Sequence, residues 1–321
     1  MKIPLQEQLA LLSLSLLTAC SPVSSSAPVP SPTASATTSA TTPATAAATA
    51  DPPPSPNLLT DEQLEKVKHY GNLGEALDAN VDDVRFLITR VHFESELERI
   101  GTLKKLQYLD LRFSDLRALS PAIASLSDLQ ILNLPVNKLG ELPPEILALK
   151  NLRRLDLSDN RLAGLPAGIK ALSKLEVLEA ASNPLEKLPP ELCELSRLRV
   201  LNLFNTSIAA LPDCIDKLQD LELLNVGNNE QLTELPASIG KLPKLKQLGL
   251  VYGFYKKIPS QVFSMVSLQN LNFADNKLTE VPKELQQLKN LKTLILTGNK
   301  LSKGEVEKAR KLLPGVTIQA E

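Results

Sequence analysis

The segment Leu152–Lys174 reads LRRLDLSDNRLAGLPAGIKALSK, and variants of it recur along most of the chain. The copies begin at Leu106, Leu129, Leu152, Leu175, Leu198, Leu221, Leu245, Leu268 and Leu291. Their spacing is 23 residues, except for 24 between Leu221 and Leu245, where one residue is inserted around Glu230 and Gln231. One such unit cannot bury its own leucines, so the units must stack and share a continuous core. The repeat therefore predicts a solenoid.

Each repeat combines two local patterns, and we number its positions from the first leucine. Leu-x-x-Leu-x-Leu at positions 1 to 6 alternates in the manner of a short strand with two inward leucines. The proline that follows in most copies ends regular strand pairing, and Ile-x-x-Leu after it has the spacing of a helical or 3₁₀ turn. Stacked copies should form a parallel sheet on a concave face and irregular turns on a convex face.

These motifs resemble the leucine-rich repeat family, in its 23-residue subtype with a Leu-Pro-x-x-Ile-x-x-Leu second half. The resemblance covers about Val84 to Glu321 and rests on the same offsets recurring eight or nine times. It implies an α/β solenoid, the leucine-rich repeat horseshoe with a parallel concave sheet. Binding surfaces of stacked solenoids usually lie on that concave face.

Asparagine occupies position 9 of most repeats. A buried amide there can satisfy a carbonyl and an N–H where the chain leaves the strand, and an amide has no useful pKa for catalysis. We interpret this ladder as structural: Asn137, Asn160, Asn183, Asn229, Asn276 and Asn299. Ser114, Thr206 and Gly253 interrupt it, and we expect the Leu245 repeat to bend differently because Gly253 has no side chain.

The N-terminus resembles a bacterial lipoprotein signal peptide. Leu9–Leu17 is an apolar run too short to span a bilayer, and it ends in Leu17-Thr18-Ala19-Cys20, which is similar to a lipobox. The resemblance implies a signal peptide at 1–19 and lipidation of Cys20. Ser21, in place of aspartate, implies sorting to the outer membrane if the cell is Gram-negative. The alternative is a cytosolic protein with an apolar start, which the next segment disfavours.

Residues 20–56 follow as a linker. From Ser21 to Pro56 the chain is dominated by Ser, Thr, Ala and Pro, with Asp51 as the one charge and no aromatic residue. Such a segment has no side chains to bury in a core and should stay disordered. Fully extended, it could reach about 120 Å. We expect it to tether the repeat domain to a membrane.

Capping segments are expected at both ends of the solenoid. Residues 57–83 read as a helical N-terminal cap that opens with a capping box at Thr60 and Gln63. Residues 84–105 read as a degenerate first repeat, and 106–290 as eight repeats. The last partial repeat and a C-terminal helical cap fill 291–321, where Ser302 and Glu305 suggest another capping box.

Composition argues against several classes of function. The formal net charge is −1, with cations scattered among acids, so no basic stripe for nucleic acid is present. There are 2 histidines, His69 in the N-terminal cap and His92 in the degenerate first repeat. We interpret His92 as a solvent-facing residue, and a metal site or a Ser/His/Asp site at His92 is the alternative. The sequence contains no phosphate loop, metalloprotease motif or nucleophile elbow. We therefore expect a monomer that is not an enzyme and has no cofactor, metal or nucleic-acid partner.

Cys193 and Cys214 lie in the convex turns of successive repeats. Neighbouring turns are close enough for a disulfide, and an exported compartment is oxidising. The alternative is two small apolar fillers, a common use of cysteine. Both interpretations stay open at this point.

Two groups of residues are candidates for ligand binding on the concave face, beside an acid and amide stripe formed by Asp110, Asn133, Asp156, Glu179, Asn202, Asn225 and Asn272. Exposed aromatic residues are typical interface anchors. The N-terminal group is Phe86, Tyr108, Phe113 and Val136, with Arg90 and Arg112 alongside. The C-terminal group is Phe204, Val251, Tyr252 and Tyr255, with Phe254 and Lys256 on the rim. Phe204, Val251 and Tyr252 should face outward, whereas Tyr255 also fits a core position.

These features predict a membrane-tethered lipoprotein of the cell envelope that binds a protein partner through its concave face. The first alternative is a glycan or peptidoglycan binder, in which the aromatic rings would stack on sugars. The second is a secreted effector acting on host proteins, which the lipobox disfavours.

Replacing Cys20 tests the anchor. Cys20→Ser should move the protein from the membrane fraction to the soluble fraction, because no thiol remains to carry a lipid. The repeat domain should stay folded, since the linker separates it from residue 20. Fractionation of cells that express each form measures the change. A variant that still sediments with membranes contradicts the lipoprotein hypothesis.

Overall fold

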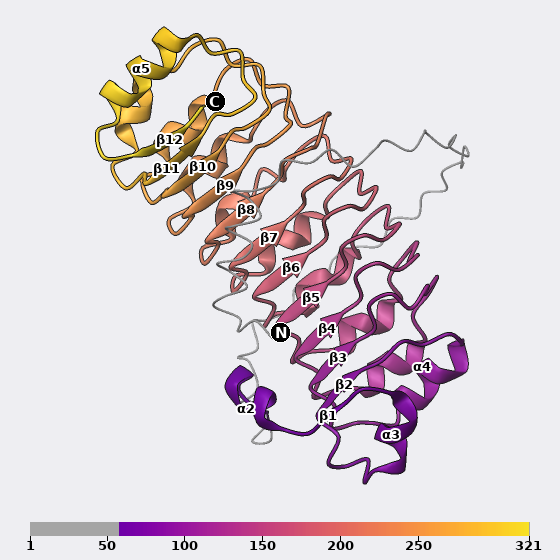
Figure 1. Cartoon of the computed structure of the whole chain (residues 1–321). Helices are drawn as coiled ribbons and strands as arrows, with labels where there is room; N and C mark the ends of the chain where they lie inside the picture. The colour runs from indigo at the N-terminus through magenta and orange to yellow at the C-terminus, as the bar shows by residue number, and fades with distance from the viewer. Residues whose placement is uncertain (1–57, 321) are drawn as a thin grey trace, which may run out of the picture.

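A computed structural model describes residues 58–320, which form one solenoid with twelve parallel strands paired in chain order from β1 to β12. Figure 1 shows the strands side by side from the indigo N-terminal end to the yellow C-terminal end. The leucine-rich repeat fold expected from the sequence is confirmed. The signal peptide at 1–19, the lipidation site Cys20 and the linker at 20–56 lie outside the described residues.

Nine three-residue strands come from the nine regular repeats. Each pairs with the strand of the next repeat, so that Leu109 faces Leu132 and Leu132 faces Leu155. The leucines at positions 4 and 6 of these strands are almost fully buried in one core cluster. The strands are β3 Tyr108–Asp110, β4 Ile131–Asn133, β5 Arg154–Asp156, β6 Val177–Glu179, β7 Val200–Asn202, β8 Leu223–Asn225, β9 Gln247–Gly249, β10 Asn270–Asn272 and β11 Thr293–Ile295.

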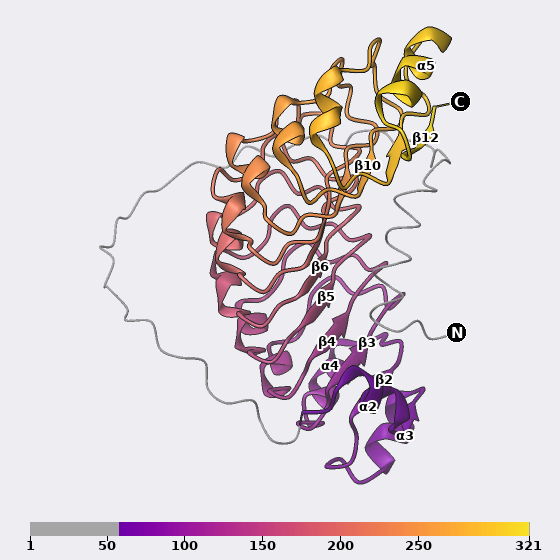
Figure 2. The same cartoon turned by 90° about the vertical axis from the view of Figure 1, so that its left-hand side faces the viewer.

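Short 3₁₀ helices cover the opposite, convex side (Figure 2). Most begin directly after a proline whose extended backbone ends the preceding segment, and each buries a central aliphatic residue such as Ile146 or Ile169. They are η1 Pro121–Ser125, η2 Pro144–Ala148, η3 Ala167–Ala171, η4 Pro190–Glu194, η5 Ile215–Lys217, η6 Ala237–Lys241, η7 Ser260–Ser264 and η8 Lys283–Gln287.

The N-terminal cap at 57–83 contains a strand as well as helices, which the sequence did not predict. It runs α2 Asp61–Lys66, β1 His69–Tyr70 and α3 Leu73–Asp78. The degenerate first repeat at 84–105 follows with β2 Phe86–Ile88 and α4 Glu94–Ile100. The capping box at Thr60 forms as expected. The α2 end is tied to the repeats because Gln130 donates to the Leu59 carbonyl and Arg153 pairs with Asp61 at 3.0 Å. Between residues 58 and 320, no helix has the length and apolar character needed to cross a membrane.

The C-terminal end also differs from expectation. Helix α5 Lys303–Leu312 forms, and the Ser302 side chain accepts from the Glu305 N–H. The helix does not end the sheet, however. The chain continues into β12 Thr317–Gln319, which pairs with β11 and becomes the last strand. Glu305 accepts from the Val281 N–H, so α5 is fastened to the neighbouring repeat instead of closing a capping box on Ser302.

The position 9 asparagines join adjacent repeats. The Asn160 side-chain nitrogen donates to the Leu134 and Leu157 carbonyls, both at 2.9 Å. Its oxygen accepts from the Leu139 N–H at 3.0 Å. Equivalent bonds occur at Asn137, Asn183, Asn229, Asn276 and Asn299. One amide thus satisfies backbone groups of its own repeat and of the one before.

The ladder interruptions have different structural effects. Thr206 donates through its hydroxyl to the Leu203 carbonyl and keeps the usual turn. After Ser114 and Gly253, the next residues, Asp115 and Phe254, adopt left-handed backbone with φ of 59° and 55°. The different bend expected for the Leu245 repeat is therefore present, and the Leu106 repeat shares it.

Cys193 and Cys214 form a disulfide on the convex side, with the two Cα atoms 5.9 Å apart. Cys193 lies in η4, and Cys214 directly precedes η5. Closing a loop of this length in the unfolded chain contributes about 3 kcal/mol of stability in the chain-entropy model. The bond therefore fastens two neighbouring turns near the middle of the solenoid.

Removing one ladder amide tests its structural role. Asn160→Ala in the full-length protein should lower the free energy of unfolding by about 1–3 kcal/mol, because buried backbone groups lose their partners. Chemical denaturation measures the change. The control is Asn270→Ala, since the Asn270 side chain faces the concave side and forms no hydrogen bond that we find within residues 58–320. Equal small losses in both variants would contradict this role.

Candidate binding surface on the concave face

Position 5 points to the concave side, and in seven of the nine regular repeats it holds the acid and amide stripe expected from the sequence, whereas Gly249 and Ile295 fill the other two. The fold uses side-chain oxygens of five stripe residues. Asp110 accepts from the Arg112 N–H at 3.1 Å, and Asn202 accepts from the Phe204 N–H at 3.1 Å. Asp156, Asn225 and Asn272 make the same bond two residues ahead. Five of the seven stripe residues therefore cap the strand ends, as short polar side chains commonly do at turns.

Position 8, which follows these caps, has left-handed backbone in all nine regular repeats, with φ between 52° and 68°. Six repeats place small or polar residues there: Asp159, Ser182, Asn205, Asn228, Asp275 and Gly298. Phe113, Val136 and Tyr252 fill the other three. Bulky and β-branched side chains are strained in this conformation by about 1–2 kcal/mol. Phe113, Val136 and Tyr252 are therefore poorly suited to the left-handed backbone that position 8 requires.

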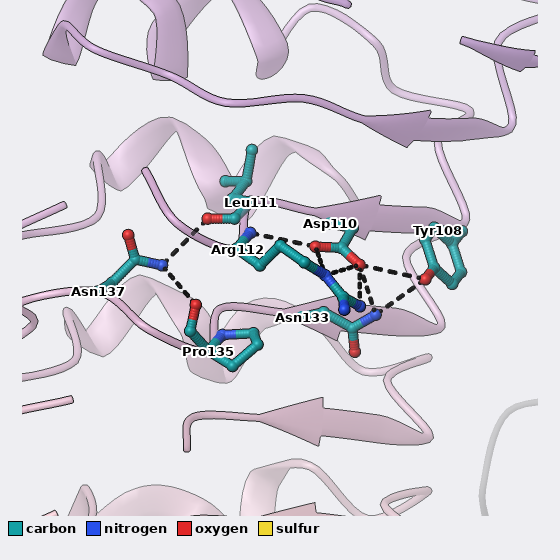
Figure 3. A network of polar contacts seen from close by, with 7 residues as sticks. All are labelled: Tyr108, Asp110, Leu111, Arg112, Asn133, Pro135 and Asn137. Atoms are coloured by element: carbon teal, nitrogen blue, oxygen red, sulfur yellow. Dashed lines mark hydrogen bonds and ion pairs between the residues drawn. The ribbon is translucent and has the colours of Figure 1, made fainter. Parts of the chain in front are cut away.

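The N-terminal group is organised around Asp110, which is 1% exposed (Figure 3). Arg112 Nε donates to both carboxylate oxygens at 2.9 Å, and Nη2 donates to Oδ2 at 2.5 Å. Tyr108 donates its hydroxyl proton to the same carboxylate, and Asn133 donates to the Tyr108 hydroxyl oxygen at 3.0 Å. The structure thus brings Tyr108 and Arg112 together, and Asp110 fixes both.

Three aromatic rings stack beside this network. The His69 and Phe86 ring centroids are 3.7 Å apart, and those of Phe86 and Tyr108 are 3.9 Å apart with near-parallel planes. The rings follow the strand register from β1 to β3. Both faces of Phe86 are therefore covered by other rings. His69 also bonds through Nε2 to the Leu64 carbonyl, whereas His92 is exposed beside α4.

Phe113 and Val136 lie where the chain leaves β3 and β4, with 51% and 41% of their surfaces exposed. The Phe113 N–H donates to the Pro135 carbonyl, which places the two residues in neighbouring repeats side by side. The Arg90 guanidinium lies 5.6 Å from the Phe113 ring centroid. All the N-terminal candidates therefore share one end of the solenoid.

In the C-terminal group, Val251 differs from the sequence expectation, and Tyr255 takes the core alternative instead of the ligand-binding one. Val251, expected to face outward, is 2% exposed and packs against Ala274 and Ile295. Tyr255 is 7% exposed and belongs to the core, with its ring beside Phe273. Neither side chain is available to a ligand, because strand-end residues of adjacent repeats cover the first and the core encloses the second.

Gly253 has a packing reason that the sequence did not reveal. A Cβ at this position would lie 2.3 Å from Cε2 of Tyr255, so glycine makes room for the larger ring. The interrupted ladder here accordingly reflects core packing. Phe204 and Tyr252 are half-buried, and Phe204 lies beside Gly227, where a Cβ would come within 3.2 Å of its ring. Phe254 and Lys256 are exposed on the rim, with Lys277 over the Phe254 ring.

Glu179 stands out in the middle of the position 5 row. Its Oε2 accepts from Asn202 at 2.9 Å, and its Oε1 has no hydrogen-bond partner within the described residues. Burial and the nearby Asp156 raise the pKa of Glu179 to about 7, and burial also raises the pKa of Asp156. Across residues 58–320, no three His, Cys, Asp or Glu side chains are grouped as metal ligands would be.

Comparison with known proteins agrees with this geometry. A family model described as a leucine-rich repeat region matches residues 87–201 and 190–313. This chain belongs to the leucine-rich repeat family. A search of proteins with curated functions found no match to it.

Solved leucine-rich repeat structures resemble the chain over most of its length. A leucine-rich repeat protein of Leptospira interrogans is 32% identical, with 74% of this chain and 66% of that one covered, at a TM-score of 0.67. An internalin from Listeria monocytogenes is 18% identical over 82% and 84% of the chains, at a TM-score of 0.63, and shows the fold alone. The repeat domain of the type III effector XopL is 28% identical over 65% and 74%, at 0.57.

The buried hydroxyl of Tyr255 yields a test of the core assignment. This oxygen has no hydrogen-bond partner within the described residues, and burial raises the pKa of Tyr255 to about 12. Tyr255→Phe should leave stability unchanged or raise it by up to about 1–2 kcal/mol, because an unpaired buried hydroxyl is removed. Denaturant titration of the full-length protein measures the difference.

The same variant should also resist alkali better. The phenol loses its proton near pH 10 in the unfolded chain and near pH 12 in the folded one, so this residue's contribution to stability falls as pH rises between those values. Tyr70→Phe is the control, because the hydroxyl of Tyr70 is not among the buried oxygens that lack a hydrogen-bond partner within the described residues. A clear loss of stability in Tyr255→Phe would mean that the hydroxyl is bonded.

Proposed function

We propose that this leucine-rich repeat chain is a lipid-anchored protein of a bacterial cell envelope that holds a protein partner on its concave face without catalysing a reaction. The twelve-stranded sheet supplies a continuous surface, and its family supplies binding scaffolds. The lipid on Cys20 and the linker to residue 56 would keep that surface near a membrane. The candidate contacts are Tyr108, Arg112, Phe113, Phe204 and Tyr252.

The orientation of Arg112 carries this proposal. Its side chain is 49% exposed, yet two of its nitrogens are fixed by the buried Asp110 carboxylate. The bond to Asp110 raises the pKa of the guanidinium, so the charge is permanent. The N–H groups that do not face Asp110 remain to bind a carbonyl or carboxylate of a partner. Little side-chain entropy is then lost on binding.

Tyr108 adds a second fixed group. Burial raises its pKa to about 12, so the hydroxyl stays neutral in any physiological range. Tyrosine and arginine are the residues most often found at the energetic centres of protein interfaces. Their pairing on one rigid strand end is suited to a protein surface.

The stacked rings favour a protein partner over a glycan. Sugar rings stack on open aromatic faces, and both faces of Phe86 are occupied by His69 and Tyr108. One face of Tyr108 is likewise occupied. Phe86 therefore offers no open face for a sugar, and its exposed edge suits side chains and carbonyl groups instead.

Two features support an exported, envelope location. The lipobox-like sequence ends at Cys20, and Ser21 is compatible with the outer membrane of a Gram-negative cell. The Cys193–Cys214 disulfide is of a kind that persists in oxidising compartments. An effector released into host cytosol would lose both, so we rank that alternative lower.

Site-specific crosslinking in intact cells tests this proposal. A photoreactive phenylalanine analogue at Tyr108, Phe204 or Tyr252 should give covalent adducts with one identifiable envelope protein. The same group at Lys170 or Glu194, an exposed convex pair 3.3 Å apart, should not. Adducts only from the convex positions, or only with peptidoglycan, contradict the proposal.

Arg112→Lys then tests whether the partner contacts the fixed Arg112 guanidinium, which we call the Arg112 fork. Lysine keeps a cation beside Asp110, so the fold is retained, but it cannot bind two groups in fixed directions. Adduct yield at Tyr108 should fall about tenfold or more, as for an interface arginine. The matched convex variant Lys170→Arg should leave the yield unchanged. An unchanged yield in Arg112→Lys would remove Arg112 from the site.

A further inference from the structure

The exposed side chains of Phe113 and Val136 form a short apolar ridge at the N-terminal rim, which we call the Phe113–Val136 ridge. Both residues have left-handed backbone, with φ of 58° and 56°. Both are among the exposed large hydrophobic residues, and neither belongs to the core cluster. The ridge therefore combines backbone strain with solvent exposure.

Neither the backbone strain nor the solvent exposure of Phe113 and Val136 stabilises the fold. The next four repeats fill the same position with Asp159, Ser182, Asn205 and Asn228, which suit left-handed backbone better. Exposure means that the Phe113 and Val136 side chains return little hydrophobic stabilisation. Strained residues that packing does not require are typical of functional sites. The ridge is accordingly better explained by binding than by stability.

The surroundings of the ridge are predominantly basic. Arg90 lies over the Phe113 ring, and the exposed Asp115 is held by Lys138 at 2.6 Å. Arg117 and Arg161 lie close enough to Asp115 to help lower its pKa. Within residues 58–320 we find no ion pair of Arg90, Arg117 or Arg161. Among the acids, Asp115 is paired with Lys138 and Asp110 with Arg112, and Asp159 is the next residue along the position 8 row. Arg90, Arg117 and Arg161 therefore outnumber the unpaired carboxylate among these residues.

We propose that the Phe113–Val136 ridge docks an acidic, apolar segment of the protein partner. A leucine or phenylalanine of that segment would pack on Phe113 and Val136, and flanking carboxylates would face Arg90, Arg117 and Arg161. This assignment rests on the proposed protein-binding function and adds the chemistry of the partner. It also extends the contact surface from the concave face to the rim, because Phe113 directly follows Arg112 in the chain.

Defined peptides test the assignment with the full-length protein. The probe is a fluorescent twelve-residue peptide with a central Phe-Leu pair flanked by two glutamates on each side. One matched peptide has lysine for every glutamate, and another has serine for Phe and Leu. The acidic apolar probe should bind at least about tenfold more tightly than either, and added salt should weaken it.

Variants on the ridge locate the binding site. Phe113→Asn and Val136→Asn place a residue that tolerates left-handed backbone, so each should keep or raise the thermal midpoint while weakening the probe about tenfold or more. Arg90→Gln should weaken it as well. Ser182→Asn is the control, because the same substitution in the same row lies outside the ridge. It should leave probe affinity unchanged.

The outcomes separate this inference from the proposed function. Equal binding of the lysine probe, absence of acidic-probe binding, or full binding by Phe113→Asn overturns the ridge assignment. If crosslinks from Tyr108 still depend on Arg112 in that case, the concave-face function stands alone. If the acidic probe binds the ridge but concave crosslinks are absent, the docking site stands and the concave-face proposal fails.

Discussion

The buried amide at position 9 is the interaction on which the solenoid depends. Each strand ends after three residues, and the chain must then turn beneath the next repeat with backbone groups that the sheet no longer pairs. Asn160 satisfies two carbonyls and one N–H across two repeats at once. Leucine burial alone would favour stacking without fixing its offset, because dispersion and hydrophobic forces are not directional. The amide supplies that direction in the six regular repeats that carry it.

Most of the fold can be predicted from the sequence because leucine burial and the directional asparagine bonds each belong to fixed positions of the repeat. Leucines at positions 1, 4 and 6 and asparagine at position 9 recur at a fixed offset, so strand, turn and core follow from spacing. The ends carry no such repetition. Strands β1 and β12 add to an existing edge with two or three residues each, and pairing partners decide them more than local pattern does. The conformation at position 8 could have been inferred from its Asp, Asn, Ser and Gly residues, and with it the unusual character of Phe113 and Val136.

The candidate site was only partly predictable for a related reason. Tyr108 and Arg112 could be placed on the concave side by counting positions, but the way in which the buried Asp110 carboxylate fixes both depends on side-chain contacts that the spacing does not give. Val251 is buried although its strand position suggested exposure, and Tyr255 occupies the core position that the sequence had left open. Gly253 shows why: its missing side chain accommodates the Tyr255 ring, a compensation between residues two apart that neither position reveals alone. Volume complementarity of this kind is a property of pairs and is not encoded in a repeat consensus.

The disulfide between Cys193 and Cys214 has a mechanical consequence. A stack in which each repeat contacts only its neighbours unfolds from its ends, one repeat after another. Fraying that starts at β12 meets a covalent ring once it reaches Cys214, because the turn before η5 cannot leave η4 while the bond holds. The same ring stops fraying that travels from the other end. Pulling on one terminus would therefore leave the loop between the two cysteines unloaded, because the force passes through the bond from one turn directly to the other.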